Sequence, residues 1–375
     1  MIFSDEHIAK LRNYDFFKKD RLDAMNDGLR TVKAWGEYKT NPPYISFVVT
    51  TYKRPTLLKY TIESIIRQNY DDCEIIVVDN ECADISEDTQ TQQLIKNFNN
   101  PKIVYFRNID PMVARMDRAA SLATGEWICF CHDDDMLAAN HLETMLPIIK
   151  AHPEINFLSC GFRVFFEDEF DKIISNGFIA NQLHEGFCRE STIEEGVFFR
   201  QGRWTGALIR RHLYNEMGGM PKIKSNCGDA VMCSKFIYNY GGFYRLAAPM
   251  YFYRISKNQI SSQIDEQINL VIGNYFYFRY ALTKINNPPK LDHEKLCLAY
   301  VLVEMKKTEK IWGVKFDLGQ IAQKCQIKKI EIDDDEMQQY INIWEDYEKK
   351  IVEEKKQKGF EIFIEKIATI PYRYF

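Results

Sequence analysis

The sequence predicts an α/β protein built on an open, parallel β-sheet with helices on its faces. Short apolar, β-branched stretches alternate with stretches whose apolar residues recur at helical spacing, as in strand–helix–strand units. Several of these apolar stretches end in a threonine or a carboxylate. Of the 375 residues, 46% are hydrophobic and 14% aromatic, so the chain can bury a substantial core.

The first strand is expected at residues 45–51, where Ile-Ser-Phe-Val-Val-Thr-Thr is short and nearly all apolar. Buried parallel strands have this composition. Pro55 then stands where a helix can begin. Leu58, Ile62 and Ile65 follow at helical spacing, so this helix would cover one face of the sheet.

The same alternation continues along the chain. Further strands are expected at residues 74–79, 102–106 and 126–131, with helices between them. Right-handed connections leave the carboxyl ends of parallel strands at one edge of the sheet, where ligands bind in open α/β folds. The polar groups at these ends should therefore meet at one rim: Thr51, Asp79, Asp133, Asp134 and Asp135.

Two breaks in composition divide the chain. Residues 1–43 are charged and aromatic, and the weak helical pattern there ends at Pro42 and Pro43, so we expect an N-terminal helical extension. Residues 44–262 would form the α/β domain. Residues 263–375 are rich in Lys, Glu and Ile and would form a mostly helical C-terminal region.

Charge and cysteine usage narrow the class of function. Lys and Arg number 49 and Asp and Glu 53, a net charge of −4 that argues against a general nucleic-acid binder. The 10 cysteines include no Cys-x-x-Cys pair, and the N-terminus does not resemble a signal peptide. No window reaches about 18 continuous apolar residues, the minimum for a spanning helix. We therefore expect a cytoplasmic protein.

The strongest local signal is the run of Asp133, Asp134 and Asp135 directly after a buried strand. Adjacent carboxylates repel one another, and a divalent cation compensates for that repulsion. An all-oxygen ligand set suits a hard ion such as Mg²⁺ or Mn²⁺. The alternative is a solvated acidic turn before a helix. The other polar groups at the rim favour the metal site.

Other rim residues suit a nucleotide. Tyr52 can stack on a base and Arg54 can pair with phosphate, although each can equally be an ordinary surface residue. Asp79 can accept hydrogen bonds from a base or ribose, or can end a turn before Asn80. Arg115 lies near the start of a predicted helix, where it can neutralise a diphosphate.

Two further positions allow more than one interpretation. Asp229 follows Gly228 at the start of a predicted helix that runs to Tyr240, and it is either a helix cap or a general base. Trp204, followed by Thr205, can stack on a sugar ring or belong to the core. The local sequence does not decide between these alternatives.

Taken together, residues 45–261 resemble the family 2 glycosyltransferases, which have the GT-A fold, an open mixed sheet flanked by helices. The matching segments occur in the family's order, which makes a chance resemblance improbable. They are residues 48–55, 74–80, 114–127, 130–135, 218–219 with 228–229, and 249–254.

This resemblance implies that a sugar moves from a nucleotide-diphosphate donor, most often a UDP-sugar, to an acceptor hydroxyl with inversion at the anomeric carbon. The setting would be surface polysaccharide or glycolipid synthesis. Asp134 would be the main ligand of Mn²⁺ or Mg²⁺, with support from Asp135, and Asp229 would be the catalytic base. Trp204 and Thr205 would border a saccharide or lipid-linked acceptor. The nucleotide sugar would contact Thr51, Tyr52, Arg54, Asp79, Arg115 and Asp133.

Several positions depart from the family's pattern. The family often has Glu-Asp where this chain has Gly228-Asp229, and Asn where it has Asp117. It often has Asp in place of His132, and His in place of Ser256. The family's histidine can help to hold the metal, so the third protein ligand is open. A catalytically inactive scaffold subunit of a polysaccharide assembly complex is the alternative function.

The C-terminal segment, residues 360–375, is aromatic and mildly basic at its tip. Such a segment can rest at the inner face of a membrane beside a lipid-linked acceptor, as a peripheral contact. Packing against a partner subunit or the main domain is equally compatible with its composition. The oligomeric state is not indicated by the sequence.

Overall fold

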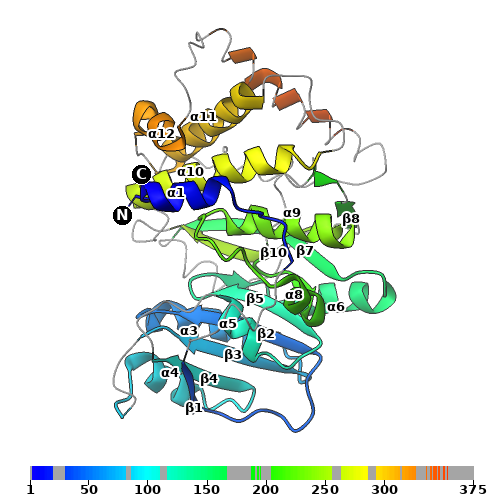
Figure 1. Cartoon of the computed structure of the whole chain (residues 1–375). Coiled ribbons are helices and arrows are strands. Elements are labelled where there is room, and N and C mark those ends of the chain that lie inside the picture. The colour runs from blue at the N-terminus through cyan, green and yellow to red at the C-terminus, as the bar shows by residue number, and fades with distance from the viewer. Residues whose placement is uncertain are drawn as a thin grey trace.

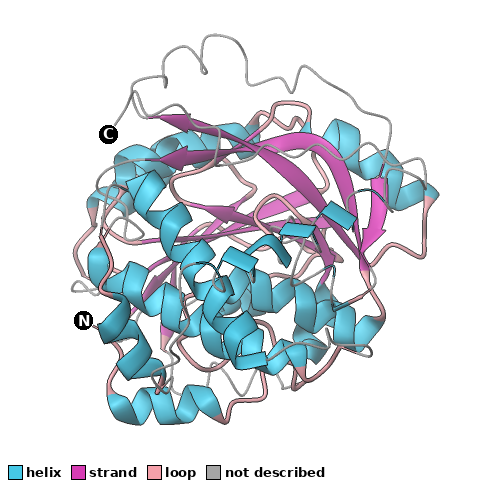
Figure 2. Ribbon diagram, turned by 90° about the horizontal axis from the view of Figure 1, so that it is seen from above, coloured by secondary structure: helices cyan, strands magenta, loops and turns pink. Residues whose placement is uncertain are grey.

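The computed structural model describes residues 2–19, 30–81, 86–109, 116–166, 187–190, 192, 193, 195, 204–255, 263–285, 293–312, 315–326 and single or short stretches between 335 and 353. Within these residues ten strands form one mixed sheet. Helices cover both faces of the sheet (Figure 2). The architecture is therefore the helix-flanked open sheet that the sequence predicts.

One half of the sheet is parallel. Its four strands lie side by side, as expected for strands connected by helices (Figure 1). An antiparallel strand, β1 (Thr31–Trp35), pairs with the outermost of them. In sheet order from that edge the parallel strands are β4 (Ile103–Asn108), β3 (Cys73–Asp79), β2 (Ile45–Thr51) and β5 (Trp127–His132).

The other half of the sheet mixes directions. The short strand β9 (Leu208–Arg210) runs antiparallel to β5 and joins the two halves. Beyond it β7 and β10 pair in parallel, whereas β6 and β8 each pair antiparallel with β10. Their bounds are β6 (Met136–Leu137), β7 (Phe157–Phe166), β8 (Phe187–Glu190) and β10 (Phe243–Ile255).

Alternate residues of the parallel strands supply two separate cores. Val48 and Ile76 belong to one hydrophobic cluster, and Phe47 and Ile75 to the other, because successive side chains of a strand point to opposite faces. Helices α5 (Met116–Leu122), α8 (Arg211–Met217), α9 (Gly228–Tyr240) and α10 (Ile264–Leu282) cover the first cluster, and α3 (Pro55–Ile66), α4 (Gln90–Phe98) and α6 (His141–Ala151) the second.

The two ends of the chain share one helical layer. Helix α1 (Asp5–Arg12) lies beside α10 (Figure 1). The Phe3 amide donates a buried hydrogen bond of 2.8 Å to the Asn269 side chain of α10. Lys324, in α12 (Leu318–Cys325), pairs with Asp5 at 2.7 Å. A further helix, α11 (His293–Trp312), packs against α10.

The N-terminal segment is only partly helical. Residues 1–43 were expected to form a helical extension, but the stretch Thr-Val-Lys-Ala-Trp forms β1 and extends the sheet. Its alternation of branched and polar residues suits an edge strand. The helices α10, α11 and α12 agree with a mostly helical C-terminal region, and the boundaries at residues 43 and 262 stay predictions.

The predicted C-terminal limit of α9 is confirmed, and the helix begins at Gly228, one residue before the predicted start at Asp229. It ends at Tyr240 because Gly241 adopts a left-handed conformation with φ of 74°, which glycine tolerates best. Among the described residues, no helix combines the length and the apolar character needed to cross a membrane. The C-terminal segment 360–375, for which a membrane or protein contact was considered, lies outside the described residues.

Candidate active site

The carboxyl ends of β2 and β5 bring two of the predicted polar clusters together. These strands pair in parallel, with Thr50 opposite His132, so the residues that follow each strand lie side by side. The Thr51 hydroxyl donates a hydrogen bond of 2.8 Å to Oδ2 of Asp133. The acidic turn, which we define as Asp133, Asp134 and Asp135, is thus anchored to the neighbouring strand.

Two arginines from opposite ends of the fold face the acidic turn. Nη1 of Arg54 lies 3.4 Å from Asp133 Oδ1 and 3.2 Å from Asp134 Oδ2. Nη2 of Arg254 lies 3.5 Å from the same Asp134 oxygen, and its main-chain amide donates to Asp135 Oδ1 at 2.9 Å. The Arg254 side chain is only 3% exposed and that of Arg54 26%. Both guanidinium groups offset the negative charge of the turn.

Helix α3 also contacts the main chain of the acidic turn. The Thr61 hydroxyl in α3 lies 2.7 Å from the main-chain oxygen of Asp135 and 3.2 Å from that of His132. The imidazole of His132 meets the ring of Trp204 edge-on, with the ring centres 5.9 Å apart. The conformation of the turn is therefore fixed by contacts from three separate elements.

Burial changes the acidity of Asp133. The pKa of this carboxyl is raised, first because the group is buried and second because the Asp134 charge is adjacent. The Thr51 hydroxyl and the Arg54 guanidinium act in the opposite direction by favouring the ionised form. Additional positive charge beside the turn would stabilise all three ionised carboxylates.

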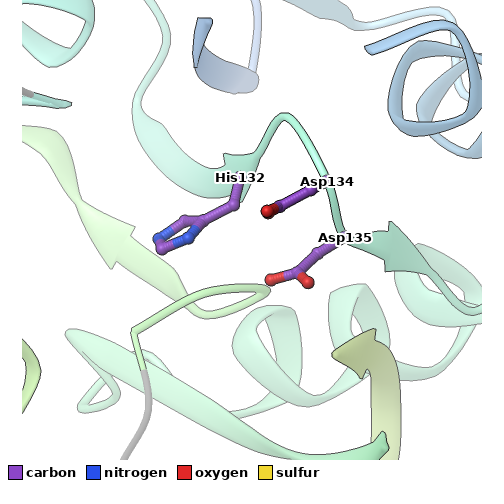
Figure 3. A group of neighbouring side chains, drawn as sticks. All are labelled: His132, Asp134 and Asp135. Carbon is purple, nitrogen blue, oxygen red and sulfur yellow. The ribbon is translucent and has the colours of Figure 1, made fainter. Parts of the chain in front are cut away.

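The acidic turn and the preceding histidine offer a donor set for a divalent cation. His132, Asp134 and Asp135 each present one ligand atom, and these atoms lie within 4.8 Å of one another (Figure 3). Opposite ligands around a small octahedral ion are about 4.2 Å apart, so only slight adjustment is needed. Two carboxylates and an imidazole fit a divalent cation, and the set differs from the all-oxygen site expected from sequence because it includes a nitrogen.

Asp79 occupies a different environment at the end of β3. It lies opposite Thr51 and is fully buried. The Tyr105 hydroxyl donates to its Oδ2 at 2.7 Å, and the Glu81 amide donates to its Oδ1 at 2.9 Å. Burial raises the pKa of the Asp79 carboxyl, and these two donors oppose that rise. Carboxylate oxygens have further lone pairs, so the group retains capacity to accept from a ligand.

The two residues proposed to border the acceptor, Trp204 and Thr205, are buried. Trp204 is 3% exposed, and its ring centre lies 4.5 Å from that of Phe130. Thr205 is also buried and forms an isolated bridge with Phe130. This packing agrees with the core interpretation of Trp204. Its assignment to an acceptor site, like that of Thr205, stays a prediction.

The remaining candidates divide into one exposed residue and several whose side chains are not described. Tyr52, at 52% exposure, is the most open aromatic of the rim candidates. Arg115 and Ser256 lie outside the described residues. Asp229 belongs to the first turn of α9, but its side chain is likewise outside the described set. Their predicted roles stay predictions.

Three contributors were not assigned a site role from sequence. Arg254 belongs to the matched segment 249–254, and an arginine after the apolar and aromatic run Pro-Met-Tyr-Phe-Tyr is itself a signal, because buried charges are normally paired. His132 was noted only as a departure from a family pattern. Tyr105 lies in the apolar strand β4, where a hydroxyl needs a partner.

Comparison with known proteins identifies the central part of the chain. Residues 46–218 match the model of "Glycosyl transferase family 2". These residues, somewhat less than half of the chain, therefore resemble glycosyltransferase family 2. The resemblance expected from the ordered motifs is thereby confirmed.

Two bacterial relatives share segments of the glycosyltransferase domain. The putative colanic acid biosynthesis glycosyl transferase WcaA of Escherichia coli is 36% identical over 108 residues, 28% of this chain and 38% of that protein. The GalNAc(5)-diNAcBac-PP-undecaprenol beta-1,3-glucosyltransferase of Campylobacter jejuni is 31% identical over 109 residues, 28% of this chain and 34% of that protein. The matched segments therefore span little more than a third of each relative.

A solved structure supports the fold over a greater length. S. aureus TarS 1-349 in complex with UDP-GlcNAc aligns with a TM-score of 0.51 and 16% identity, covering 84% of this chain and 92% of that chain. At this level of identity the likeness concerns the fold alone. The glycosyltransferase domain thus has the GT-A fold, as the sequence predicted.

Proposed function

We propose that this protein is an inverting, metal-dependent glycosyltransferase that moves a sugar from a nucleotide-diphosphate donor to an acceptor hydroxyl. One observation carries the proposal. The Thr51 hydroxyl of β2, Arg54 before α3 and Arg254 of β10 converge on the acidic turn after β5, in a segment that matches the family 2 glycosyltransferase model. This arrangement matches the needs of a reaction whose leaving group is a diphosphate that gains negative charge as the bond to the sugar breaks.

The donor would be held by side chains on both sides of the acidic turn. Exposed Tyr52 is available to stack on the base, and Asp79 would accept a hydrogen bond from the base or ribose. Arg54 would pair with the diphosphate, because a guanidinium matches phosphate geometry and this one is partly exposed. Thr51 and Asp133 would complete the ribose and diphosphate contacts, and Arg115 would add charge.

His132, Asp134 and Asp135 would hold a divalent cation. When bound, Mn²⁺ or Mg²⁺ supplies positive charge that stabilises the leaving diphosphate. Arg54 and Arg254 keep the same region positive from two sides, since they already neutralise the carboxylates of the turn. Positive groups placed in advance where charge develops lower the barrier without rearrangement.

The acceptor hydroxyl needs a base because it is a poor nucleophile at neutral pH. We assign this role to Asp229, in the first turn of α9, because Gly228-Asp229 resembles the segment that carries the base in the family. Asp229 would take the proton as the hydroxyl oxygen attacks the anomeric carbon and the bond to the diphosphate breaks. Such a base contributes about 10²–10⁴-fold. Attack opposite the leaving group inverts the configuration.

The substrates are proposed by analogy with relatives. The TarS complex contains UDP-GlcNAc, so UDP-sugars are the first donors to test. The names of the two relatives refer to colanic acid biosynthesis and to an undecaprenol-linked saccharide, which favours surface polysaccharide or glycolipid synthesis on a saccharide or lipid-linked acceptor. We place the reaction in the cytoplasm, at the inner face of the membrane where lipid-linked acceptors are elongated.

The test is a panel of UDP- and GDP-sugars incubated with the purified chain and Mn²⁺ or Mg²⁺, with and without EDTA. We expect slow hydrolysis of one donor even without an acceptor, and loss of that hydrolysis in EDTA. NMR of the released sugar or glycoside would show the inverted anomer. Turnover that persists in EDTA would contradict metal dependence.

A scaffold without activity is the second candidate. Gly228 stands where many family members have an acidic residue before the catalytic aspartate. Calorimetry with UDP and GDP in the presence of Mn²⁺ separates the two functions. An enzyme should bind one of these products, whereas absence of binding by either would favour the scaffold.

A further inference from the structure

The structure offers a candidate for the third protein ligand of the metal, which the sequence does not identify. This candidate is His132, which lies close to Asp134 and Asp135. His132 is the last residue of β5, and the two aspartates follow in the turn. All three side chains point toward one common space (Figure 3). We propose that the His132 imidazole binds the divalent cation directly, and that this nitrogen makes the site selective for Mn²⁺ over Mg²⁺. This inference rests on the proposed function.

The histidine is positioned from its main chain and from one face of its ring. Its carbonyl oxygen lies 3.2 Å from the Thr61 hydroxyl and 3.4 Å from the Asp135 amide. Its ring meets the edge of Trp204, which is itself buried against Phe130. Trp204 therefore acts as a support for the ligand. This role also explains why an aromatic next to the site is covered.

The charge balance of the site favours a neutral donor. The carboxylates of Asp133 and Asp134 face the guanidinium groups of Arg54 and Arg254, and the Asp135 carboxylate accepts from the main-chain amide of Arg254. A fourth carboxylate at position 132 would add repulsion, whereas a neutral imidazole adds a ligand atom without adding charge.

The same balance indicates how the cation is accommodated. Asp134 Oδ2 is shared by Arg54 at 3.2 Å and Arg254 at 3.5 Å. Arg254 is almost fully buried and Arg54 is a quarter exposed, so Arg54 is the group that can give way. Binding would therefore exchange one positive charge for another at that oxygen. The remaining arginine keeps the carboxylates in place.

Imidazole and carboxylate differ in metal preference. Mg²⁺ favours oxygen ligands and retains several waters, whereas nitrogen ligands favour transition metals such as Mn²⁺. The intact protein should therefore bind Mn²⁺ more tightly than Mg²⁺, and His132→Asp should reduce that preference. The aspartate variant retains metal-binding capacity, because it restores the residue that family members often carry there.

The experiment measures metal binding directly. Mn²⁺ affinity is measured by electron paramagnetic resonance on the full chain, alone and with UDP, with Mg²⁺ as competitor. We expect His132→Asp and His132→Ala to weaken Mn²⁺ binding by at least about 10-fold, the lower bound for losing even an outer partner of a ligand. The ratio of Mn²⁺ to Mg²⁺ affinity should fall by a similar factor in His132→Asp. His152→Asp, at a half-exposed histidine that directly follows α6, is the matched control.

A spectroscopic readout completes the test. Pulsed resonance of bound Mn²⁺ should show coupling to a histidine nitrogen that changes with ¹⁵N-histidine labelling and disappears in His132→Asp. Bound Mn²⁺ without this coupling would overturn the His132 inference and leave metal dependence intact. Failure of the unaltered protein to bind Mn²⁺, with or without UDP, would overturn both.

Discussion

The end of β3 and the acidic turn after β5 stabilise buried carboxylates in different ways. Asp79 accepts from two neutral donors, the Tyr105 hydroxyl and the Glu81 amide. Asp134, by contrast, lies between the cationic side chains of Arg54 and Arg254. Both regions stand at the same rim of the sheet, one strand apart.

The two regions suit different tasks: Asp79 suits recognition of the nucleoside, and the acidic turn suits binding of charged groups. Neutral donors fix the direction of the Asp79 lone pairs without cancelling its charge, which suits hydrogen bonding to a base or ribose. Cationic partners at the acidic turn can be exchanged for a metal ion or shared with a diphosphate. We therefore predict that substitutions around Asp79 alter nucleotide binding, whereas substitutions at the acidic turn alter metal binding and turnover.

The largest effect is expected at Asp134. Asp134→Asn should lower kcat/KM by about 10²–10³-fold, because removing one group that stabilises developing charge has this magnitude. Steady-state kinetics with the donor found in the panel measures this effect. The control is Asp71→Asn, at a carboxylate whose side chain is 99% exposed and paired with Lys102. Equal losses in both variants would show that the acidic turn has no special role.

Substitution of Arg254 tests whether the stability of the protein depends on the arginines that pair with the acidic turn. Arg254→Gln should lower the free energy of unfolding by about 3 kcal/mol in EDTA, since it removes the buried one of the two cations that pair with Asp134. Urea unfolding measures the change. Adding Asp134→Asn should recover part of the loss, because the two groups are coupled. A strictly additive double variant would rule out that coupling, and Arg189→Gln is an exposed control.

The buried residue His141 tests how much stability is lost when a group with a neutral hydrogen-bond partner becomes charged. His141 is fully buried, and its Nε2 lies 2.6 Å from the Gly206 carbonyl oxygen. Burial lowers the pKa of His141 from 6.5 to about 4, so the unfolded chain binds the proton first as pH falls. Stability should be full above about pH 6.5 and should fall by about 3 kcal/mol as the pH drops through about 4.

Measurement of unfolding free energy against pH in His141→Gln checks this expectation. The variant should be less stable at neutral pH but should lose less between pH 6.5 and 4. His152→Gln, at an exposed histidine, should keep the pH dependence of the unaltered protein. An unchanged pH profile in His141→Gln would mean that other groups govern acid unfolding.

The smallest effect is expected at Tyr105. Tyr105→Phe removes one donor to Asp79 and should weaken UDP binding by about 5–10-fold, the equivalent of about 1 kcal/mol for a lost hydrogen bond. Mn²⁺ affinity measured without nucleotide should not change. Tyr38→Phe is the control, because that hydroxyl donates to the main-chain oxygen of Leu122. A parallel loss of Mn²⁺ affinity would show that the two regions are not independent.

Local sequence was sufficient for the elements that carry the rim. The strands expected at residues 45–51, 74–79 and 126–131 are β2, β3 and β5, and the predicted helix to Tyr240 is α9. Apolar runs bounded by Pro, Gly or carboxylates give a strong signal because they reflect local propensity and burial. The strand β1 was missed, since its pattern is short and its partner β4 is remote in sequence.

What the sequence by itself determined is which chain segments reach the rim, because strand alternation and right-handed connections fix which ends of strands share one edge. Only the tertiary structure decided which side chains meet there. Arg254 reaches Asp134 from 120 positions away, and Tyr105 reaches Asp79 across a strand pair. The alternation of residues along a strand predicts which face of the sheet each side chain occupies, but not which distant side chain it contacts. Those contacts determine the charge of the site and its hydrogen-bond donors.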